Sequence, residues 1–226
     1  MKLLIIEDET DLQESILKYL QSEGFSVETA ANYNQAEEKV DLYDYDCVIV
    51  DITLPGGTGL DIIRKLKQQN TDTGIIIISA KNSLDDKLTG LGIGADDYLT
   101  KPFHLPELNA RIKSIIRRRS FHGANESDFN EIKILFDNHK ILVNGVEVIL
   151  TRKEYDLILY FVMNKERVLS KEVIAEHLWG DDMGLAADSF DFIYTHIKNV
   201  RKKLIDKGCK DYIKTVYGIG YKFSEE

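Results

Sequence analysis

The segment Cys47-Val48-Ile49-Val50-Asp51-Ile52-Thr53-Leu54-Pro55-Gly56-Gly57 is the most informative part of the chain for its architecture. Its first four residues are apolar, which predicts a short, fully buried strand, and a carboxylate follows at once at Asp51. The sequence Pro55-Gly56-Gly57 then predicts a loop. A continuous apolar strand of this kind is typical of a parallel sheet that is covered on both faces.

Outward from this segment, residues 1–119 alternate strand and helix signals. Short apolar or alternating runs predict further strands at 3–6, 25–29, 75–78 and 97–99. The helical spacing of apolar residues predicts helices at 11–23, 34–42, 60–68, 84–92 and from Pro106 onward. Five such strand–helix units favour an α/β domain with a central parallel sheet.

The second part of the chain, residues 129–226, has a different order of elements. Strands are predicted at 132–136 and 140–143, and Asn144-Gly145 predicts a tight turn to a strand at 146–150. Thr151 and Glu154 form a capping-box pattern before one helix, Ser170 is a candidate N-cap of a second, and residues 189–205 predict a third. A hairpin over 213–223 closes the chain. This is the order of a winged helix-turn-helix domain of the α+β class.

A polar segment that contains Gly, Ser and Asn separates the two parts. We interpret residues 120–128 as a linker between domains at 1–119 and 129–226. The length of 226 residues suits two domains. Three arginines, 117–119, precede the linker, and a solvated helix end explains them better than direct DNA contact.

The composition narrows the classes of protein to consider. The two cysteines follow no metal or redox spacing, and no signal peptide or membrane span is predicted, so we expect a cytoplasmic protein without a membrane partner. The net charge of −9 argues weakly against nucleic-acid binding. Residues 194–205, however, contain Lys198, Arg201, Lys202 and Lys203 and no acid, so a local basic stripe is present.

Polar residues follow four of the five predicted strands at the point where each strand ends. They are Glu7, Asp8, Asp51, Ser79 and Lys101. The carboxyl ends of parallel strands form the ligand crevice of such a sheet. Three crowded carboxylates repel one another unless a cation joins them, and oxygen ligands suit Mg²⁺. Asp51 is the candidate nucleophile, which would form an aspartyl phosphate, while Ser79 and Lys101 could bind phosphoryl oxygens. Taken singly, Asp8 or Asp51 could also be a simple helix cap.

The predicted helix at 189–205 has two distinct faces. Its apolar face comprises Phe190, Ile193, Ile197, Val200 and Leu204. The opposite face carries Asp191, Thr195, Lys198 and Lys202, with Tyr194 and Asn199 beside it. Such a face can enter a major groove, where Lys contacts phosphate or guanine and Asn contacts adenine. A plain solvated helix face remains the alternative reading of the helix alone.

Residues 1–118 resemble the receiver domains of bacterial response regulators. The motifs that carry the resemblance are Ile6-Glu7-Asp8-Glu9, Val50-Asp51-Ile52-Thr53-Leu54-Pro55, Ser79-Ala80 and Gly94-Ala95-Asp96-Asp97-Tyr98-Leu99-Thr100-Lys101-Pro102-Phe103. The resemblance implies a flavodoxin-like fold with Asp51 as phosphoacceptor. It implies that Asp8, Asp51 and the Thr53 carbonyl bind Mg²⁺ directly and that Glu7 acts through water. It also implies a switch pair, Ser79 and Tyr98, and a cis peptide at Lys101-Pro102.

Residues 129–224 resemble the winged-helix output domain of the OmpR/PhoB family. The matching motifs include Leu178-Trp179-Gly180, the run from His196 to Leu204, and the run from Ile213 to Phe223. The resemblance, with the helix face above, gives the expected DNA contacts Thr195, His196, Lys198, Asn199, Arg201, Lys202, Tyr217 and Gly218. For the receiver it implies a dimer interface of Lys87, Asp96, Asp97, Glu107, Arg111 and Arg118. Relatives usually carry Asp where Tyr194 stands and often Arg where Tyr217 stands, so specificity does not transfer by analogy.

We therefore expect a transcription factor that a sensor histidine kinase phosphorylates on Asp51. Phosphorylation should produce a homodimer that binds promoter DNA, with a direct repeat as its site, and that acts with RNA polymerase. Thr53 and Lys81, two residues beyond Asp51 and Ser79, should set the lifetime of the phosphate. A phosphatase built on the same carboxylates would need an acid/base where Thr53 stands. A constitutive DNA-binding protein with an inactive receiver would not need the intact set of five polar residues.

Overall fold

The computed structural model describes residues 1–69, 72–80, 88, 90–121, 123–136, 138–180 and 190–225. The chain divides into two compact units, Met1–Gly123 and Ala124–Glu226, and each is described by itself. Across the described residues, no helix combines the length and the apolar character that a membrane crossing requires.

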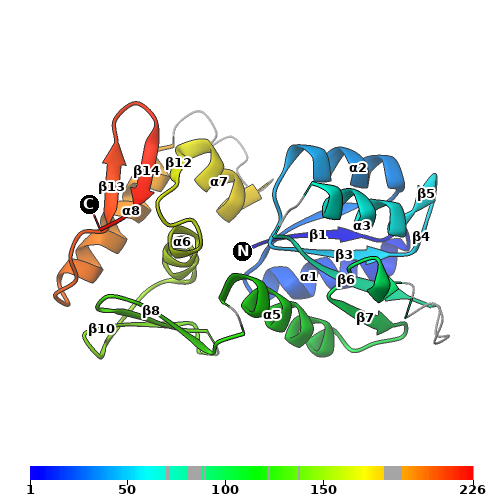
Figure 1. The fold of residues 1–226 in the computed structure, drawn as a ribbon, viewed down its shortest axis with the longest axis horizontal. Coiled ribbons are helices and arrows are strands. Elements are labelled where there is room, and N and C mark those ends of the chain that lie inside the picture. The colour runs from blue at the N-terminus through cyan, green and yellow to red at the C-terminus, as the bar shows by residue number, and fades with distance from the viewer. Residues whose placement is uncertain are drawn as a thin grey trace. The chain divides into compact units, whose positions relative to one another are not determined.

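The first unit contains a central five-stranded parallel sheet in the order β2-β1-β3-β6-β7 (Figure 1). Its strands are β1 (Lys2–Ile6), β2 (Ser26–Ala30), β3 (Cys47–Asp51), β6 (Gly74–Ser79) and β7 (Asp97–Thr100). The three inner strands, β1, β3 and β6, are buried along their whole length, which is the property that their apolar runs predict. The flavodoxin-like fold class is therefore confirmed.

Helices cover both faces of this sheet. Their bounds are α1 (Thr10–Ser22), α2 (Tyr33–Leu42), α3 (Gly59–Gln68) and α5 (Leu105–Phe121). Ile16 of α1 and Ile112 of α5 pack with Leu3 and Ile5, while α2 and α3 pack on the opposite face with Leu4 and Ile6. Figure 1 shows the two pairs of helices on either side of the strands. Consecutive residues of β1 thus enter two separate cores.

Three details of the first unit differ from the sequence prediction or lie outside it. The expected loop after Asp51 contains a small hairpin, β4 (Thr53–Leu54) and β5 (Gly57–Thr58), because Gly56 has a φ of +86° and allows a tight turn. Most of the helix expected at 84–92 lies outside the described residues. Helix α5 continues into the expected linker as far as Phe121, which is buried.

The second unit opens with an antiparallel sheet in the order β11-β10-β9-β8. Its strands are β8 (Glu126–Phe129), β9 (Ile132–Leu135), β10 (Lys140–Val143) and β11 (Val146–Val148). Because β8 begins at Glu126, regular structure enters the expected linker 120–128 from both ends. The predicted turn is present, since Asn144 and Gly145 both have positive φ, at 50° and 78°.

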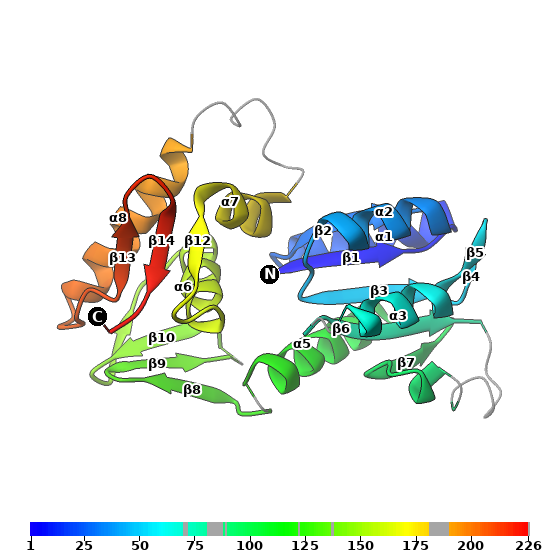
Figure 2. The same cartoon turned by 45° about the horizontal axis from the view of Figure 1, so that its top comes forward.

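Three helices and a second sheet complete this unit (Figure 2). The helices are α6 (Arg152–Met163), α7 (Lys171–Trp179) and α8 (Asp191–Ile205). The sheet has the order β12-β14-β13, with β12 (Val168–Ser170), β13 (Ile213–Val216) and β14 (Gly220–Phe223). Helix α6 packs against α7, α8 and β14, so it lies at the centre of the unit. The predicted winged-helix order is confirmed, and β12 is an additional strand.

The predicted helix starts have a structural basis. Thr151 and Glu154 form the capping box of α6 with both of its hydrogen bonds, and the Ser170 hydroxyl accepts from the Val173 amide at 3.2 Å. The expected start of the third helix at Ser189 lies outside the described residues, and α8 is described from Asp191.

Candidate functional site

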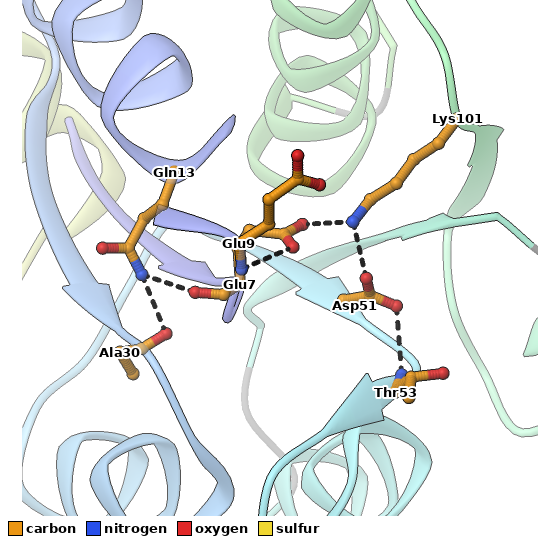
Figure 3. A network of polar contacts seen from close by, with 7 residues as sticks. All are labelled: Glu7, Glu9, Gln13, Ala30, Asp51, Thr53 and Lys101. Carbon is orange, nitrogen blue, oxygen red and sulfur yellow. Dashed lines mark hydrogen bonds and ion pairs between the residues drawn. The ribbon is translucent and has the colours of Figure 1, made fainter. Parts of the chain in front are cut away.

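The carboxyl ends of the parallel strands bring the predicted polar residues together. Asp51 is the last residue of β3, Ser79 is the last residue of β6, Glu7 follows β1 and Lys101 follows β7. The Lys101 ammonium lies 2.6 Å from Glu7 Oε2 and 2.6 Å from Asp51 Oδ2, so it bridges the ends of β1 and β3, which both precede it in the sequence (Figure 3). The arrangement that strand-end spacing predicted is thus present for these side chains.

The cluster has more negative than positive charge. Glu7, Asp8 and Asp51 offer carboxylate oxygens that all lie within 4.8 Å of one another. When these three acids are ionised, the single Lys101 ammonium leaves two negative charges uncompensated. Glu7 is fully buried and Asp51 nearly so, whereas Asp8 is exposed to solvent. A divalent cation would restore neutrality, and an exposed ligand beside buried ones leaves it room for water.

Burial also determines how these groups titrate. Desolvation raises the pKa of Glu7 above its ordinary value, and the nearby Lys101 only partly offsets this. Burial would lower the pKa of Lys101, but its close pairing with the Asp51 and Glu7 carboxylates outweighs that effect, so the pKa is raised and the lysine stays charged. Within the described residues, Glu7 Oε2 has this ion pair but accepts no hydrogen bond of good geometry. That oxygen has capacity for a cation, and the donor set fits Mg²⁺.

The backbone around Asp51 is held by close contacts. The Thr53 amide donates a hydrogen bond to Asp51 Oδ1 at 3.0 Å, which leaves Oδ2 to Lys101. Gly59, the first residue of α3, donates its amide to the Ile52 carbonyl at 2.9 Å. A Cβ atom on Gly59 would lie 1.9 Å from the Asp51 carbonyl oxygen. Helix α3 therefore begins directly against the backbone of Asp51, and only glycine fits there.

The remaining predicted receiver residues have definite places. Ser79 is buried at the end of β6, and Tyr98 is half-buried in β7, where it pairs with Ile77. The Lys101-Pro102 peptide is cis, as the resemblance implied. Thr53 is exposed at the start of β4. Lys81 lies outside the described residues.

The expected dimer residues are largely paired within one receiver unit. Arg111 of α5 contacts Asp97 at 2.7 Å and Glu107 at 2.8 Å. Asp96 contacts Arg119 at 2.9 Å, an arginine that the sequence prediction did not include. Arg118 is exposed, and Lys87 lies outside the described residues.

Helix α8 presents the two faces that its spacing predicted. Ile193, Ile197, Val200 and Leu204 are buried. The opposite face exposes Thr195, Lys198, Asn199 and Lys202, and Tyr194 beside it is 58% exposed. The Thr195 hydroxyl donates to the Asp191 carbonyl at 3.0 Å, which leaves its methyl group to solvent or a ligand.

Two of the expected DNA contacts are turned toward the interior of the unit. Arg201 donates to the Ile213 carbonyl and to Thr215 Oγ1, and it lies 3.3 Å from Asp211, so it ties α8 to β13. The His196 ring packs against Trp179 at 5.2 Å between centroids, and burial lowers the pKa of His196. The helix pattern alone cannot show that Trp179 and β13 lie beside these two side chains, and these neighbours explain why the two residues differ from the expected DNA contacts.

The turn between β13 and β14 carries the other expected contacts. Tyr217 is 92% exposed, and Gly218 has a φ of +76°, a backbone conformation that suits glycine. The aromatic side chain of Tyr217 therefore extends from the tip of this hairpin.

The candidate receiver site also contains a residue that the sequence reasoning missed. Gln13 of α1 donates its side-chain amide to the Glu7 carbonyl at 2.6 Å and to the Ala30 carbonyl at 3.2 Å (Figure 3). A lone glutamine in a helix gives no signal of such a contact, because both partners are backbone atoms of other segments.

Comparisons with known proteins match both units. Residues 3–113 match the response regulator receiver domain, and residues 145–223 match the transcriptional regulatory protein C-terminal domain. The cell cycle response regulator CtrA of Brucella anthropi is 38% identical over 229 residues, which covers 100% of this chain and 96% of the relative. CtrA of Brucella ovis has the same identity and coverage.

Solved structures match the first unit. A CheY-like response regulator receiver domain protein from Methanospirillum hungatei is 27% identical with a TM-score of 0.52, covering 54% of this chain and 98% of that one. A two-component response regulator from Clostridium difficile is 32% identical with a TM-score of 0.50, covering 52% and 97%.

Proposed function

The chain belongs to the two-component response regulators of the OmpR/PhoB type, and we propose that Asp51 is the residue whose phosphorylation controls its binding to DNA. It is a transcription regulator whose receiver domain implies a histidine kinase partner and whose C-terminal domain implies DNA binding. The contact that carries the proposal for Asp51 is the Lys101 ammonium between its carboxylate and that of Glu7, at 2.6 Å from each.

The chemistry follows from the groups at the strand ends. An Asp51 carboxylate oxygen attacks the phosphorus of the kinase phosphohistidine, so that a P–O bond forms while the P–N bond to imidazole breaks. Lys101 is positioned to pair with a phosphoryl oxygen, and the Ser79 hydroxyl at the next strand end can donate to another. The transfer is a self-modification of Asp51 rather than turnover of a substrate, because Thr53 offers no acid or base two residues further on.

Glu7, Asp8, Asp51 and the Thr53 carbonyl are the groups that would hold Mg²⁺ in this site, Glu7 through water. The ion supplies positive charge that neutralises the phosphoryl group during transfer. Ser79 and Tyr98 would then act as the switch pair, since Tyr98 lies on β7 beside β6 and can follow a movement of Ser79.

The output of the switch is proposed to be a homodimer on promoter DNA. The faces of α5 and β7 supply the dimer charges, and Thr195, Lys198, Asn199 and Lys202 of α8 supply the DNA contacts. Two linked protomers can bind head to tail, so we expect a direct repeat with half-sites about 10–11 base pairs apart. RNA polymerase is the expected partner at the promoter.

The test of this function is phosphorylation by acetyl phosphate, followed by intact-mass spectrometry. The wild-type chain should gain one phosphoryl group in the presence of Mg²⁺ and none in EDTA. Asp51→Asn should remain unlabelled, whereas Asp61→Asn, an exposed acid on α3, should be labelled like wild type. Equal labelling of Asp51→Asn and wild type would show that Asp51 is not the acceptor.

A further inference from the structure

The turn between β1 and α1 carries two of the three clustered acids, and a single side chain closes it. Gln13 lies in the second turn of α1, and its amide nitrogen reaches back to the Glu7 carbonyl at 2.6 Å and across to the Ala30 carbonyl at 3.2 Å (Figure 3). Ala30 is the last residue of β2, so this amide joins the turn to the neighbouring strand.

The backbone of Glu7 is thereby held at both of its polar atoms. Its amide donates to the Ala30 carbonyl at 3.0 Å, and its carbonyl accepts from Gln13. The Glu7 carbonyl and the Asp8 amide belong to the same planar peptide unit. Holding that oxygen therefore holds the whole peptide plane, and with it the backbone orientation of both Glu7 and Asp8.

The two acids respond differently to loss of this contact. Glu7 is buried and also accepts a hydrogen bond from the Glu9 amide at 3.2 Å, so it has local support. Asp8 is exposed, and its side chain forms no ion pair or hydrogen bond with any residue that the structure describes. The position of Asp8 therefore depends on the peptide that precedes it.

From these contacts we propose that Gln13 is a positioning residue for the divalent-cation site. Its amide holds the Glu7–Asp8 peptide so that both carboxylates face Asp51 before the cation arrives. The inference rests on the proposed use of Mg²⁺ at these acids. Groups that orient metal ligands through one intermediate contact typically affect metal affinity by roughly 10–100-fold.

The proposal can be tested by titrating the full unphosphorylated chain with Mn²⁺. The electron paramagnetic resonance signal reports the concentration of free Mn²⁺ and so gives the Kd. Gln13→Met keeps the length of the side chain and removes its donor, so the Kd for Mn²⁺ should rise roughly tenfold or more. Gln21→Met makes the same change at an exposed position of the same helix and should leave the Kd unchanged. An unchanged Kd in Gln13→Met that retains its far-ultraviolet circular dichroism would overturn the proposal.

A second measurement separates positioning from a general structural role. The rate of labelling by acetyl phosphate should need more Mg²⁺ for half-saturation in Gln13→Met, while the rate at saturating Mg²⁺ stays close to wild type. A lower plateau with unchanged half-saturation would contradict a role in cation binding.

Two further outcomes have distinct meanings. If Gln13→Met does not fold, Gln13→Asn replaces it, because the shorter amide cannot reach both carbonyls, and an unchanged Kd in that variant overturns the proposal. If the wild-type chain itself does not bind Mn²⁺, the cation site of the proposed function fails, whereas binding by wild type and Gln13→Met alike rejects only the role of Gln13.

Discussion

Arg111 of α5 donates a hydrogen bond to Asp97 of β7 within a single receiver unit, with 2.7 Å between Nη1 and Oδ2. The same guanidinium contacts Glu107 one turn earlier in the helix. These are charges that the family resemblance assigns to pairs between two protomers. Dimer formation would therefore exchange one ion pair for another. Exposed pairs contribute about 0–1 kcal/mol, so we expect these charges to set the geometry of a dimer more than its affinity.

Charge reversal at Arg111 should prevent the phosphorylated dimer. Arg111→Glu would place a third acid beside Asp97 and Glu107 on the same face, and like charges in contact disfavour association. Sedimentation velocity of the phosphorylated chain should show a dimer for wild type and a monomer for the variant. Lys113→Glu is the matched control, since Lys113 lies on the same helix but pairs with Glu23. If phosphorylated Arg111→Glu still forms a dimer, the face that carries Arg111 is not the dimer interface.

The side chain of Thr53 should set the lifetime of the aspartyl phosphate, together with Lys81. Thr53 is exposed two residues beyond Asp51, and its amide already binds Asp51, so side-chain changes there leave that hydrogen bond in place. Replacing Thr53 and Lys81 together should change the half-life several-fold by altering the approach of water. Phosphate release after removal of the donor measures this, with Thr195→Ala in the other unit as control. A half-life equal to wild type would remove the hypothesis.

The exposed face of α8 should read DNA in two separable ways. Lys202→Ala should weaken binding to all sequences and lower the slope of log K against log salt by about one, because it removes a phosphate contact. Thr195→Ala or Asn199→Ala should instead relax preference at one base pair by about 1–3 kcal/mol. Fluorescence anisotropy with a panel of site variants at two salt concentrations measures both effects.

Lys207→Ala, at an exposed position just beyond α8, is the control for loss of charge alone. Unchanged affinity and preference after alanine replacement of Thr195, Lys198, Asn199 and Lys202 together would show that this face is not the reader.

Glu154 should make the second unit sensitive to acid. Its carboxylate accepts from the Thr151 amide at 2.7 Å and lies 2.6 Å from Lys203, so it joins α6 to α8. Burial would raise the pKa of Glu154, but these hydrogen bonds outweigh it and lower the pKa below the ordinary 4.5. The stabilisation is therefore fully present above about pH 4.5 and is lost as the pH falls through the lower folded value.

Glu154→Gln should lower the free energy of unfolding by about 1–3 kcal/mol at neutral pH and flatten its fall in acid. Urea unfolding followed by the fluorescence of Trp179 measures this unit, since the chain has a single tryptophan. Glu147→Gln, in an exposed pair with Lys140, should change neither quantity appreciably. If the free energy of unfolding falls equally in acid for Glu154→Gln and for wild type, Glu154 is not the source of the acid sensitivity.

The sequence was sufficient for most of the fold and for the residues at the strand ends. Apolar runs such as 47–50 mark a strand, and the polar residue after each run marks the crevice, so Glu7, Asp51 and Lys101 were identified together. Contacts that depend on side-chain reach were not predictable. Arg201 lies beside the basic face of α8 in sequence, yet its guanidinium binds Ile213, whose carbonyl is near only because β13 packs there. Strand β12 is three residues long and pairs with β14, a partner that local patterning cannot show.

The contact between Gly59 and the Asp51 carbonyl has a consequence for genetics. Gly59 carries no reactive group, yet any side chain at this position would displace the backbone that presents Asp51. A screen for alleles that no longer signal should therefore recover substitutions of Gly59 alongside those of Asp51 itself. Such alleles would retain every charged side chain of the site, so the loss of a reactive group would not explain their phenotype. The explanation is steric, because a Cβ atom at position 59 would lie 1.9 Å from the Asp51 carbonyl oxygen.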